Sequence, residues 1–146
     1  HKMAYNKNEL MRFLDAQNKL YLSALAEIKR GKKESHWMWF VFPQIKGSGS
    51  CDTSKFYEIK NADEAIAFLE HPILGKHLIE ITSELIKTEE KTAEEIFGNP
   101  DDERLQSCLT LFASIQNTEP VFQEALHKYF DGSSDFHTLQ LLYSNL

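Results

Sequence analysis

Ser35-His36-Trp37-Met38-Trp39-Phe40-Val41-Phe42-Pro43-Gln44 is the stretch of sequence that decides the fold. It is too dense in aromatic residues for a surface helix or an ordinary turn, so we expect it to be buried. Ser35 can cap a short helix that ends before Pro43, because proline disfavours helical backbone in the preceding residue. A short buried strand is the alternative, since Val41 and the aromatic residues have strand propensity. We favour a helix or irregular buried structure over residues 35–42.

An amphipathic helix is predicted immediately before this aromatic segment. Apolar residues recur at three- and four-residue steps from Asn8 to Arg30, and Gly31 ends the pattern. A one-sided apolar stripe of this length needs a packing partner. The aromatic segment that follows is apolar enough to supply it.

The remainder of the chain is dominated by helix-start signals. Residues 46–55 are rich in Gly and hydroxyl residues and predict a loop, and residues 56–59 predict a short extended piece. The spacing Asn61 to Glu64, repeated at Thr92 to Glu95, is that of a capping box. Helix starts are further expected at Pro72, Pro100 and Pro120, and a last helix over 136–143.

These signals predict a mainly α fold, a compact single-domain bundle of about seven or eight helices, some of them short, with an aromatic-rich buried segment after the first helix. The connections are short, and we see neither a linker nor an internal repeat. We expect the domain to cover residues 4–146, with residues 1–3 an added remnant that ends in the start methionine.

The composition is that of an ordinary globular protein, with 42% hydrophobic and 26% charged residues. A formal charge of -6 repels phosphate backbones and argues against broad nucleic-acid binding. No apolar run approaches the roughly 20 residues that span a bilayer, so no membrane association is expected. Cys51 and Cys108 have no CxxC spacing and are expected to be free thiols in the cytoplasm. The histidines show no compact ligand spacing, so neither a metal nor a cofactor is expected, and the oligomeric state is left open.

The first candidate site lies around the aromatic segment. Tryptophan faces stack on bases and lysine heads pair with phosphates, so a nucleotide-like small molecule would find both contacts here. In the other interpretation both tryptophans fill the core and His36 only hydrogen-bonds a carbonyl. The proposed ligand-binding residues are Lys33, Ser35, Trp37, Trp39 and Gln44, with His36 as a catalytic candidate.

The second candidate site is the acid-headed helix that starts after Asn99-Pro100. Asp101 and Asp102 could perform acid–base work if burial raised a pKa, whereas the alternative is that they cap the helix start. Helical spacing puts residues 104, 107 and 111 on one face, with 103, 107 and 110 overlapping it. The proposed ligand-binding residues of this helix are Arg104, Ser107 and Thr110.

The chain resembles the uncharacterised bacterial family catalogued as domain of unknown function 1810, from about Phe13 to Leu142. The resemblance implies a compact, mainly α-helical protein and carries no settled activity. Two positions depart from the family pattern: the usual Gly-Leu-Gly loop is Gly47-Ser48-Gly49, and a common second serine is Cys108. The matching residues are Lys33, Ser35-His36-Trp37-Met38-Trp39-Phe40, Phe42-Pro43-Gln44, Glu64-Ala65, His71-Pro72, Leu74-Gly75, Phe97-Gly98, Asp101-Asp102, Ser107 and Thr110-Leu111-Phe112.

More weakly, the helical layout from Glu64-Ala65 onward is similar to the NADAR group, whose members act on ADP-ribose attached through an N-glycosidic bond. That likeness implies cations for the pyrophosphate, an aromatic face for the base and an acid near the glycosidic carbon. The leading hypothesis is therefore a nucleotide-derivative-binding domain for an ADP-ribose-like ligand, with hydrolysis of an ADP-ribosyl conjugate as its extension. The alternative is a non-catalytic protein-interaction domain. The leading hypothesis requires the aromatic segment and the acid-headed helix to face each other across an accessible cleft.

Overall fold

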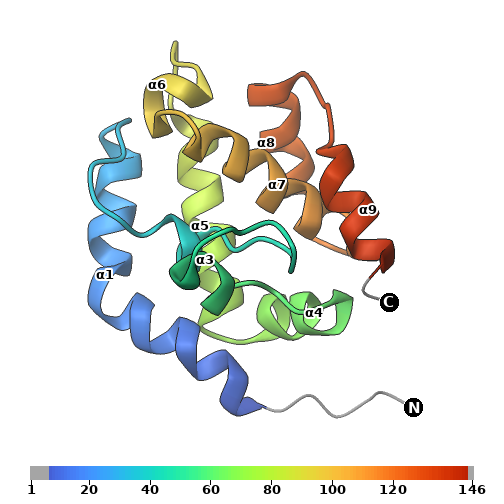
Figure 1. The fold of residues 1–146 in the computed structure, drawn as a ribbon. Coiled ribbons are helices and arrows are strands. Elements are labelled where there is room, and N and C mark those ends of the chain that lie inside the picture. The colour runs from blue at the N-terminus through green and yellow to red at the C-terminus, as the bar shows by residue number, and fades with distance from the viewer. Residues whose placement is uncertain (1–6, 145–146) are drawn as a thin grey trace.

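The computed structural model describes residues 7–144, and within them nine α-helices follow one short 3-10 helix (Figure 1). The mainly helical fold is confirmed, while the prediction for residues 1–3 lies outside the described range. In chain order the elements are η1 (Lys7–Leu10), α1 (Met11–Lys29), α2 (Met38–Val41), α3 (Asp52–Phe56), α4 (Ala62–Glu70), α5 (Leu74–Lys87), α6 (Ala93–Phe97), α7 (Asp101–Ala113), α8 (Pro120–Phe130) and α9 (Phe136–Ser144).

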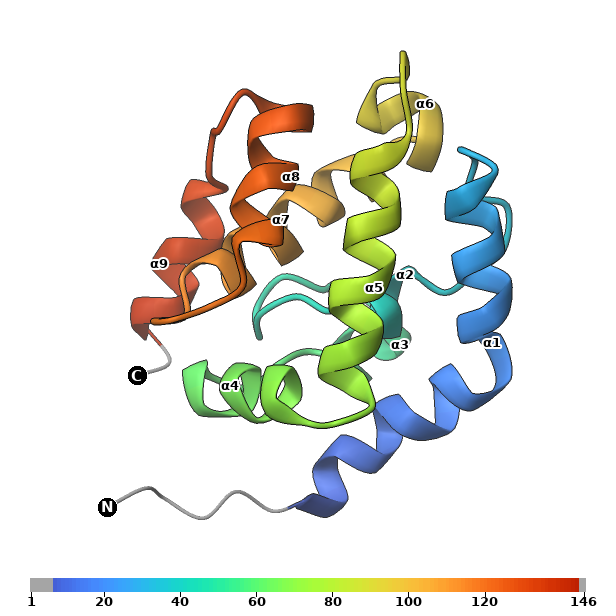
Figure 2. The same ribbon diagram turned by 180° about the vertical axis from the view of Figure 1, so that it is seen from behind.

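Helix α5 lies at the centre of one face of the molecule, between α1 and α8 (Figure 2). Its apolar residues recur at helical spacing and are buried, namely Leu74, Leu78, Ile81 and Leu85. Helix α7 packs against α8 and α9, and α4 closes the bundle against α5. Within the residues described, no helix is long and apolar enough to cross a bilayer.

The aromatic segment is buried, and its middle forms the short helix α2, as favoured from the sequence. The strand alternative is wrong for Met38–Val41. The rings of Trp37, Phe42 and Phe97 lie with their centroids 5.8 to 6.3 Å apart. Phe97 comes from α6, so this aromatic cluster joins two distant parts of the chain in one core.

The carboxylate of Glu27 anchors the start of the aromatic segment. Its Oε1 accepts hydrogen bonds from Glu34 N at 2.8 Å, Ser35 N at 3.0 Å and Trp37 Nε1 at 2.8 Å. Its Oε2 accepts a further bond from Ser35 Oγ. Burial opposes ionisation of Glu27, but these hydrogen bonds outweigh it and lower the pKa from 4.5 to about 2.

This anchor corrects the expected role of Ser35. The residue before α2 is Trp37, and it makes no side-chain cap bond to the helix. Ser35 instead donates to Glu27 of α1. As a cap, the Ser35 oxygen would accept from a backbone N–H of the helix, whereas here its hydroxyl donates to the charged carboxylate of Glu27, which is a strong acceptor.

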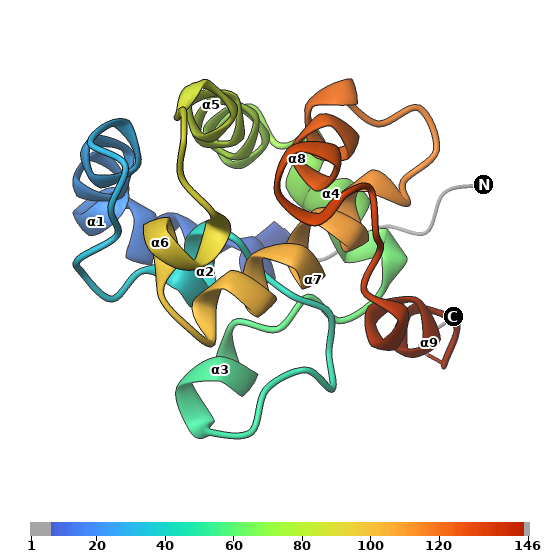
Figure 3. The ribbon, with the colours of Figure 1, turned by 90° about the horizontal axis from the view of Figure 1, so that it is seen from above.

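The segment between α2 and α4 differs from the predicted loop and extended piece. Helix α3 forms inside the expected loop. Extended pairing is limited to a parallel bridge between Ile45 and Ile59, both fully buried. Two backbone bonds of 2.7 Å hold it, from Lys46 N to Ile59 O and from Ile59 N to Gln44 O. The bridge closes residues 46–58 into a compact excursion from the bundle (Figure 3).

The helix starts follow the sequence signals with local shifts. Thr92 and Glu95 form the expected capping box. Asn61 accepts from Glu64 N at 2.9 Å, but the Glu64 carboxylate accepts from Lys60 N instead of returning to Asn61. Helix α7 begins at Asp101, so Pro100 is its cap and not its first residue.

The α4–α5 junction requires a glycine. Helix α5 starts at Leu74, two residues later than the signal at Pro72 predicts. His71 Nδ1 accepts from Ile73 N at 3.0 Å and from Leu74 N at 3.2 Å. A Cβ atom at Gly75 would lie 1.9 Å from Leu69 O, which belongs to the rigid last turn of α4.

We therefore expect Gly75→Ala to destabilise the protein by about 1 to 3 kcal/mol, because the added methyl must push two packed helices apart. Urea unfolding measures the change, with Lys76→Ala at the adjacent exposed position as the control. At an unhindered helical position the same substitution stabilises by about 0.4 to 1 kcal/mol. A gain in stability for Gly75→Ala would therefore contradict the close approach.

The depressed pKa of Glu27 predicts a pH-dependent contribution to folding. Because the folded pKa is below the unfolded one, the contribution is present above pH about 4.5 and is lost as the pH falls towards 2. It amounts to about 3 kcal/mol at neutral pH and about 1 kcal/mol at pH 2.5. The difference in unfolding free energy between wild type and Glu27→Gln should thus shrink by about 2 kcal/mol between pH 6 and pH 2.5. A pH-independent difference would show that the charge of Glu27 does not matter.

Candidate functional site

The aromatic segment and the acid-headed helix α7 meet through an ion-pair network centred on Asp101. Lys33 Nζ lies 3.0 Å from Asp101 Oδ2, and Arg104 Nη1 lies 2.7 Å from Asp101 Oδ1. The Arg104 guanidinium carbon lies 4.2 Å from the centroid of the Trp39 ring. The two stretches that the sequence separates by about sixty residues are therefore neighbours in direct contact, whereas the leading hypothesis placed an accessible cleft between them.

A groove of about 500 Å³ opens beside this network, between α7 and the start of α9. We call it the α7–α9 groove. The 43–51 loop runs beside α7 towards α9 and forms its third wall (Figure 3). Its lining residues are Gln44, Ser48, Pro100, Glu103, Arg104, Gln106, Ser107, Asp135 and His137.

Three of the predicted ligand-binding residues line the groove, namely Gln44, Arg104 and Ser107. Trp39 does not line the groove; it lies at a crevice too narrow for a water molecule, which shares Gln44 and Ser48 with the groove. Spacing on one helix placed Arg104 and Ser107 on the same face. Their meeting with Gln44 and Trp39 depends on how the aromatic segment packs against α7.

Asp135 is a groove residue that the sequence reasoning missed. Its Oδ2 accepts from Ser107 Oγ at 2.9 Å and from both the backbone and the hydroxyl of Thr138. Its own N–H donates to Thr110 Oγ1 at 2.8 Å. The only sequence signal was local, since Asp135 stands three residues before Thr138 at a helix start. Nothing in that spacing indicates the contact with Ser107.

Other predicted ligand residues belong to the framework behind the groove. Trp37 is fully buried, and it donates to Glu27, so stacking on a ligand would require the core to open. The side chain of Lys33 is 8% exposed and is held by Asp101 and by Ser35 O at 2.7 Å. Thr110 is buried and accepts from the backbone of Asp135. These residues shape the groove from behind without lining it.

The predicted catalytic residues also lie outside the groove lining. Asp101 is occupied by its two ion pairs. Asp102 Oδ1 accepts from Asn99 Nδ2 and Glu103 N, both at 2.9 Å, from within the first turn of α7, whose cap residue Pro100 makes no side-chain cap bond. His36 is exposed in the turn before α2. The carboxylates that line the groove are those of Glu103 and Asp135.

The chemistry of the lining is mixed and polar. Arg104 and His137 provide donors, Glu103 and Asp135 provide acceptors, and an amide and a hydroxyl stand between them. Such a lining suits a polar ligand better than an apolar one. Among residues 7–144 no three His, Cys, Asp or Glu side chains gather in a way that could hold a metal ion.

Residues 7–142 match the family described as "Protein of unknown function (DUF1810)". The chain belongs to the DUF1810 family. A solved structure, that of the conserved hypothetical protein Rv1873 from Mycobacterium tuberculosis, is similar with a TM-score of 0.90 and 42% sequence identity. The similarity covers 92% of this chain and 96% of the other. A comparison with curated proteins gave no significant match.

Within this DUF1810 chain, the two departures from the family pattern fall in different places. Ser48, at the middle of the Gly47-Ser48-Gly49 turn, lines the α7–α9 groove. Gly47 has a φ of 100°, and a Cβ there would lie 2.9 Å from Leu141 Cδ2 of α9. Cys108 is buried in the core, where burial raises the pKa of its thiol. The first of these two positions therefore lies in the groove wall, and the second does not.

The Asp101 network predicts a stability effect that separates the two acidic residues. Asp101→Ala should cost about 2 kcal/mol, because it leaves the nearly buried ammonium of Lys33 without its counter-charge. Asp102→Ala removes the same helix-start charge but no ion pair, so its cost should be about 1 kcal/mol or less. Urea unfolding at pH 7 compares the two variants. Equal effects would mean that the Lys33–Asp101 pair adds nothing.

Proposed function

We propose that the α7–α9 groove binds a small nucleotide-derived ligand of the ADP-ribose class. The observation that carries the proposal is the Arg104 guanidinium, which lies at the groove and is held between the Asp101 carboxylate and the Trp39 ring. A guanidinium fixed in this way presents its remaining N–H donors in one geometry, which suits the oxygens of a pyrophosphate. A groove of about 500 Å³ lies within the usual range for small-molecule sites.

The other groove residues supply the contacts that such a ligand needs. Gln44 offers both a donor and an acceptor to a base edge or a ribose hydroxyl. Glu103 and Asp135 offer carboxylate oxygens to further hydroxyl groups. Ser107, which also lines the groove, donates a hydrogen bond to the Asp135 carboxylate. In this proposal Lys33, Ser35 and Trp37 support the site from behind, and Trp39 forms its aromatic edge.

Hydrolysis of an N-glycosidic conjugate is a second candidate function, and Asp135 favours it. Three donors hold one oxygen of this carboxylate, so its position at the groove is fixed. The carboxylate would accept a proton from a water molecule as the water oxygen bonds to the anomeric carbon. The C–N bond would break with its electron pair on nitrogen, the leaving nitrogen would take up a proton from solvent, and Asp135 would return its proton to solvent. Asp135 thereby takes the role first considered for Asp101, Asp102 and His36.

The binding proposal predicts that ADP-ribose stabilises the protein. Ligand at about 100 times its dissociation constant should add roughly 2.7 kcal/mol to the unfolding free energy, which raises the melting temperature. Arg104→Gln should weaken binding at least about tenfold in isothermal titration calorimetry, because the charge-assisted contacts are lost. Arg30→Gln changes an exposed arginine away from the groove and should leave the affinity unchanged.

The outcomes separate binding, turnover and the interaction-domain alternative. If Arg104→Gln weakens ADP-ribose binding and Arg30→Gln does not, the result supports binding in the α7–α9 groove. If ADP-ribose, ADP and NAD all leave the melting temperature unchanged, the proposal fails and the non-catalytic interaction domain is favoured. Hydrolysis is supported if the wild type releases ADP-ribose from a conjugate and Asp135→Asn does not, although this variant still binds ADP-ribose. Binding without turnover would remove only the second function.

A further inference from the structure

A second hollow, of about 690 Å³, lies beside the excursion of residues 46–58 and collects basic side chains. We call it the basic groove, after Arg12, Lys46, Lys55 and Lys60, which line it. The carboxylates of Glu9 and Glu58 also reach it. Four cationic side chains line it together with two carboxylates, and one of the four, Arg12, is also paired with the buried Glu64.

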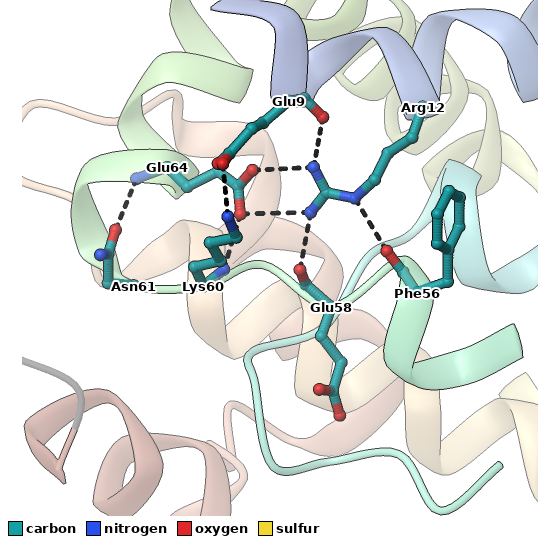
Figure 4. Close-up of polar contacts among 7 residues, drawn as sticks. All are labelled: Glu9, Arg12, Phe56, Glu58, Lys60, Asn61 and Glu64. Carbon is teal, nitrogen blue, oxygen red and sulfur yellow. Dashed lines mark hydrogen bonds and ion pairs between the residues drawn. The ribbon is translucent and has the colours of Figure 1, made fainter. Parts of the chain in front are cut away.

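Arg12 builds the wall of the basic groove (Figure 4). Its guanidinium donates to Phe56 O and Glu58 O, both at 2.8 Å, and its Nη1 donates to Glu64 Oε2 at 3.0 Å. Glu64 is fully buried, so this pair fixes the α3–α4 connection against α1. The backbone of residues 56–58 therefore forms one wall of the groove, and Arg12 holds this wall in place.

The two carboxylates of the basic groove are engaged by neighbouring groups. Glu58 Oε2 accepts from Gly47 N at 3.1 Å and from Gly49 N at 2.8 Å, and this carboxylate points away from the Arg12 guanidinium (Figure 4). Glu9 Oε2 lies 2.6 Å from Lys60 Nζ. The exposed ammonium group of Lys55 adds positive charge beyond these pairs.

Phe56 adds an aromatic surface to the same groove. Phe56 is 58% exposed, although the transfer of a large apolar side chain out of water is favourable. Its backbone is held by Arg12, and its ring packs edge-on against Tyr57 with the centroids 4.9 Å apart. A fixed, exposed ring beside lysines matches a ligand that combines a planar ring with phosphate.

We propose that the basic groove is a second ligand site, which binds a nucleoside phosphate with its base on Phe56 and its phosphates on Lys55 and Lys60. Exposed ammonium groups attract phosphate oxygens through interactions that salt weakens. A base stacks on an aromatic face with little regard to its identity. This site does not depend on the α7–α9 groove, since the two hollows have no lining residue in common.

ADP titrated into the isotope-labelled full chain tests the proposal by amide chemical-shift changes. We expect shifts at Lys55, Phe56 and Asn61, a dissociation constant that rises with salt, and binding of adenosine at least about tenfold weaker than that of ADP. Lys55→Gln should weaken ADP binding about three- to tenfold, whereas Lys29→Gln, at an exposed position of α1, should leave ADP binding unchanged. Phe56→Ala should reduce the preference for ADP over inorganic pyrophosphate.

The result for the basic groove can be told apart from that for the α7–α9 groove. Arg104→Gln should leave the ADP shifts around Phe56 intact, and Lys55→Gln should leave ADP-ribose binding to the α7–α9 groove intact. Shifts confined to residues 104–107 and 135–138 would overturn the second site while supporting the first. Equal affinities of Lys55→Gln and Lys29→Gln, or no shift near Phe56 at millimolar ADP, would also overturn it.

Discussion

The structure depends on one buried carboxylate, that of Glu27. Four donors from residues 34–37 converge on it, including the indole N–H of Trp37. A buried charge of this kind is tolerated only where it is fully hydrogen-bonded, so the turn after α1 has little freedom. Its geometry delivers Trp37 into the core against Phe42 and Phe97.

The same turn determines where the candidate site forms. With residues 34–37 fixed on Glu27, Lys33 reaches Asp101 at the start of α7, and Asp101 in turn holds Arg104 over Trp39. Buried or nearly buried charges thus form a supporting layer, and the buried Gln44 together with the half-buried Ser107 and Asp135 lines the groove in front of it. Removing a charge from the layer should act on stability, while removing one from the groove should act on binding.

The helices themselves were largely predictable, because their signals are local. The box at Thr92 and Glu95, the stripe of α1 and the start at Pro120 each depend on residues within a few turns. Ser35 was mispredicted because Glu27 of α1 takes its hydroxyl. Helix α3 was missed although the bonds at its start, between Cys51 and Ser54, are local. Of the predicted site, Gln44, Arg104 and Ser107 line the groove, whereas Trp37 and Lys33 lie behind it.

The sequence by itself determined a mainly helical chain with a buried aromatic segment, since periodicity, capping residues and apolar density act over short distances. Only the tertiary structure decided which polar residues face a cavity. Asp101 and Asp135 illustrate the difference: each is an acidic residue at a helix start, yet one is bound by two cations and the other lines a groove beside Ser107. The reason is physical, because the availability of a carboxylate depends on partners that the fold brings from distant parts of the chain.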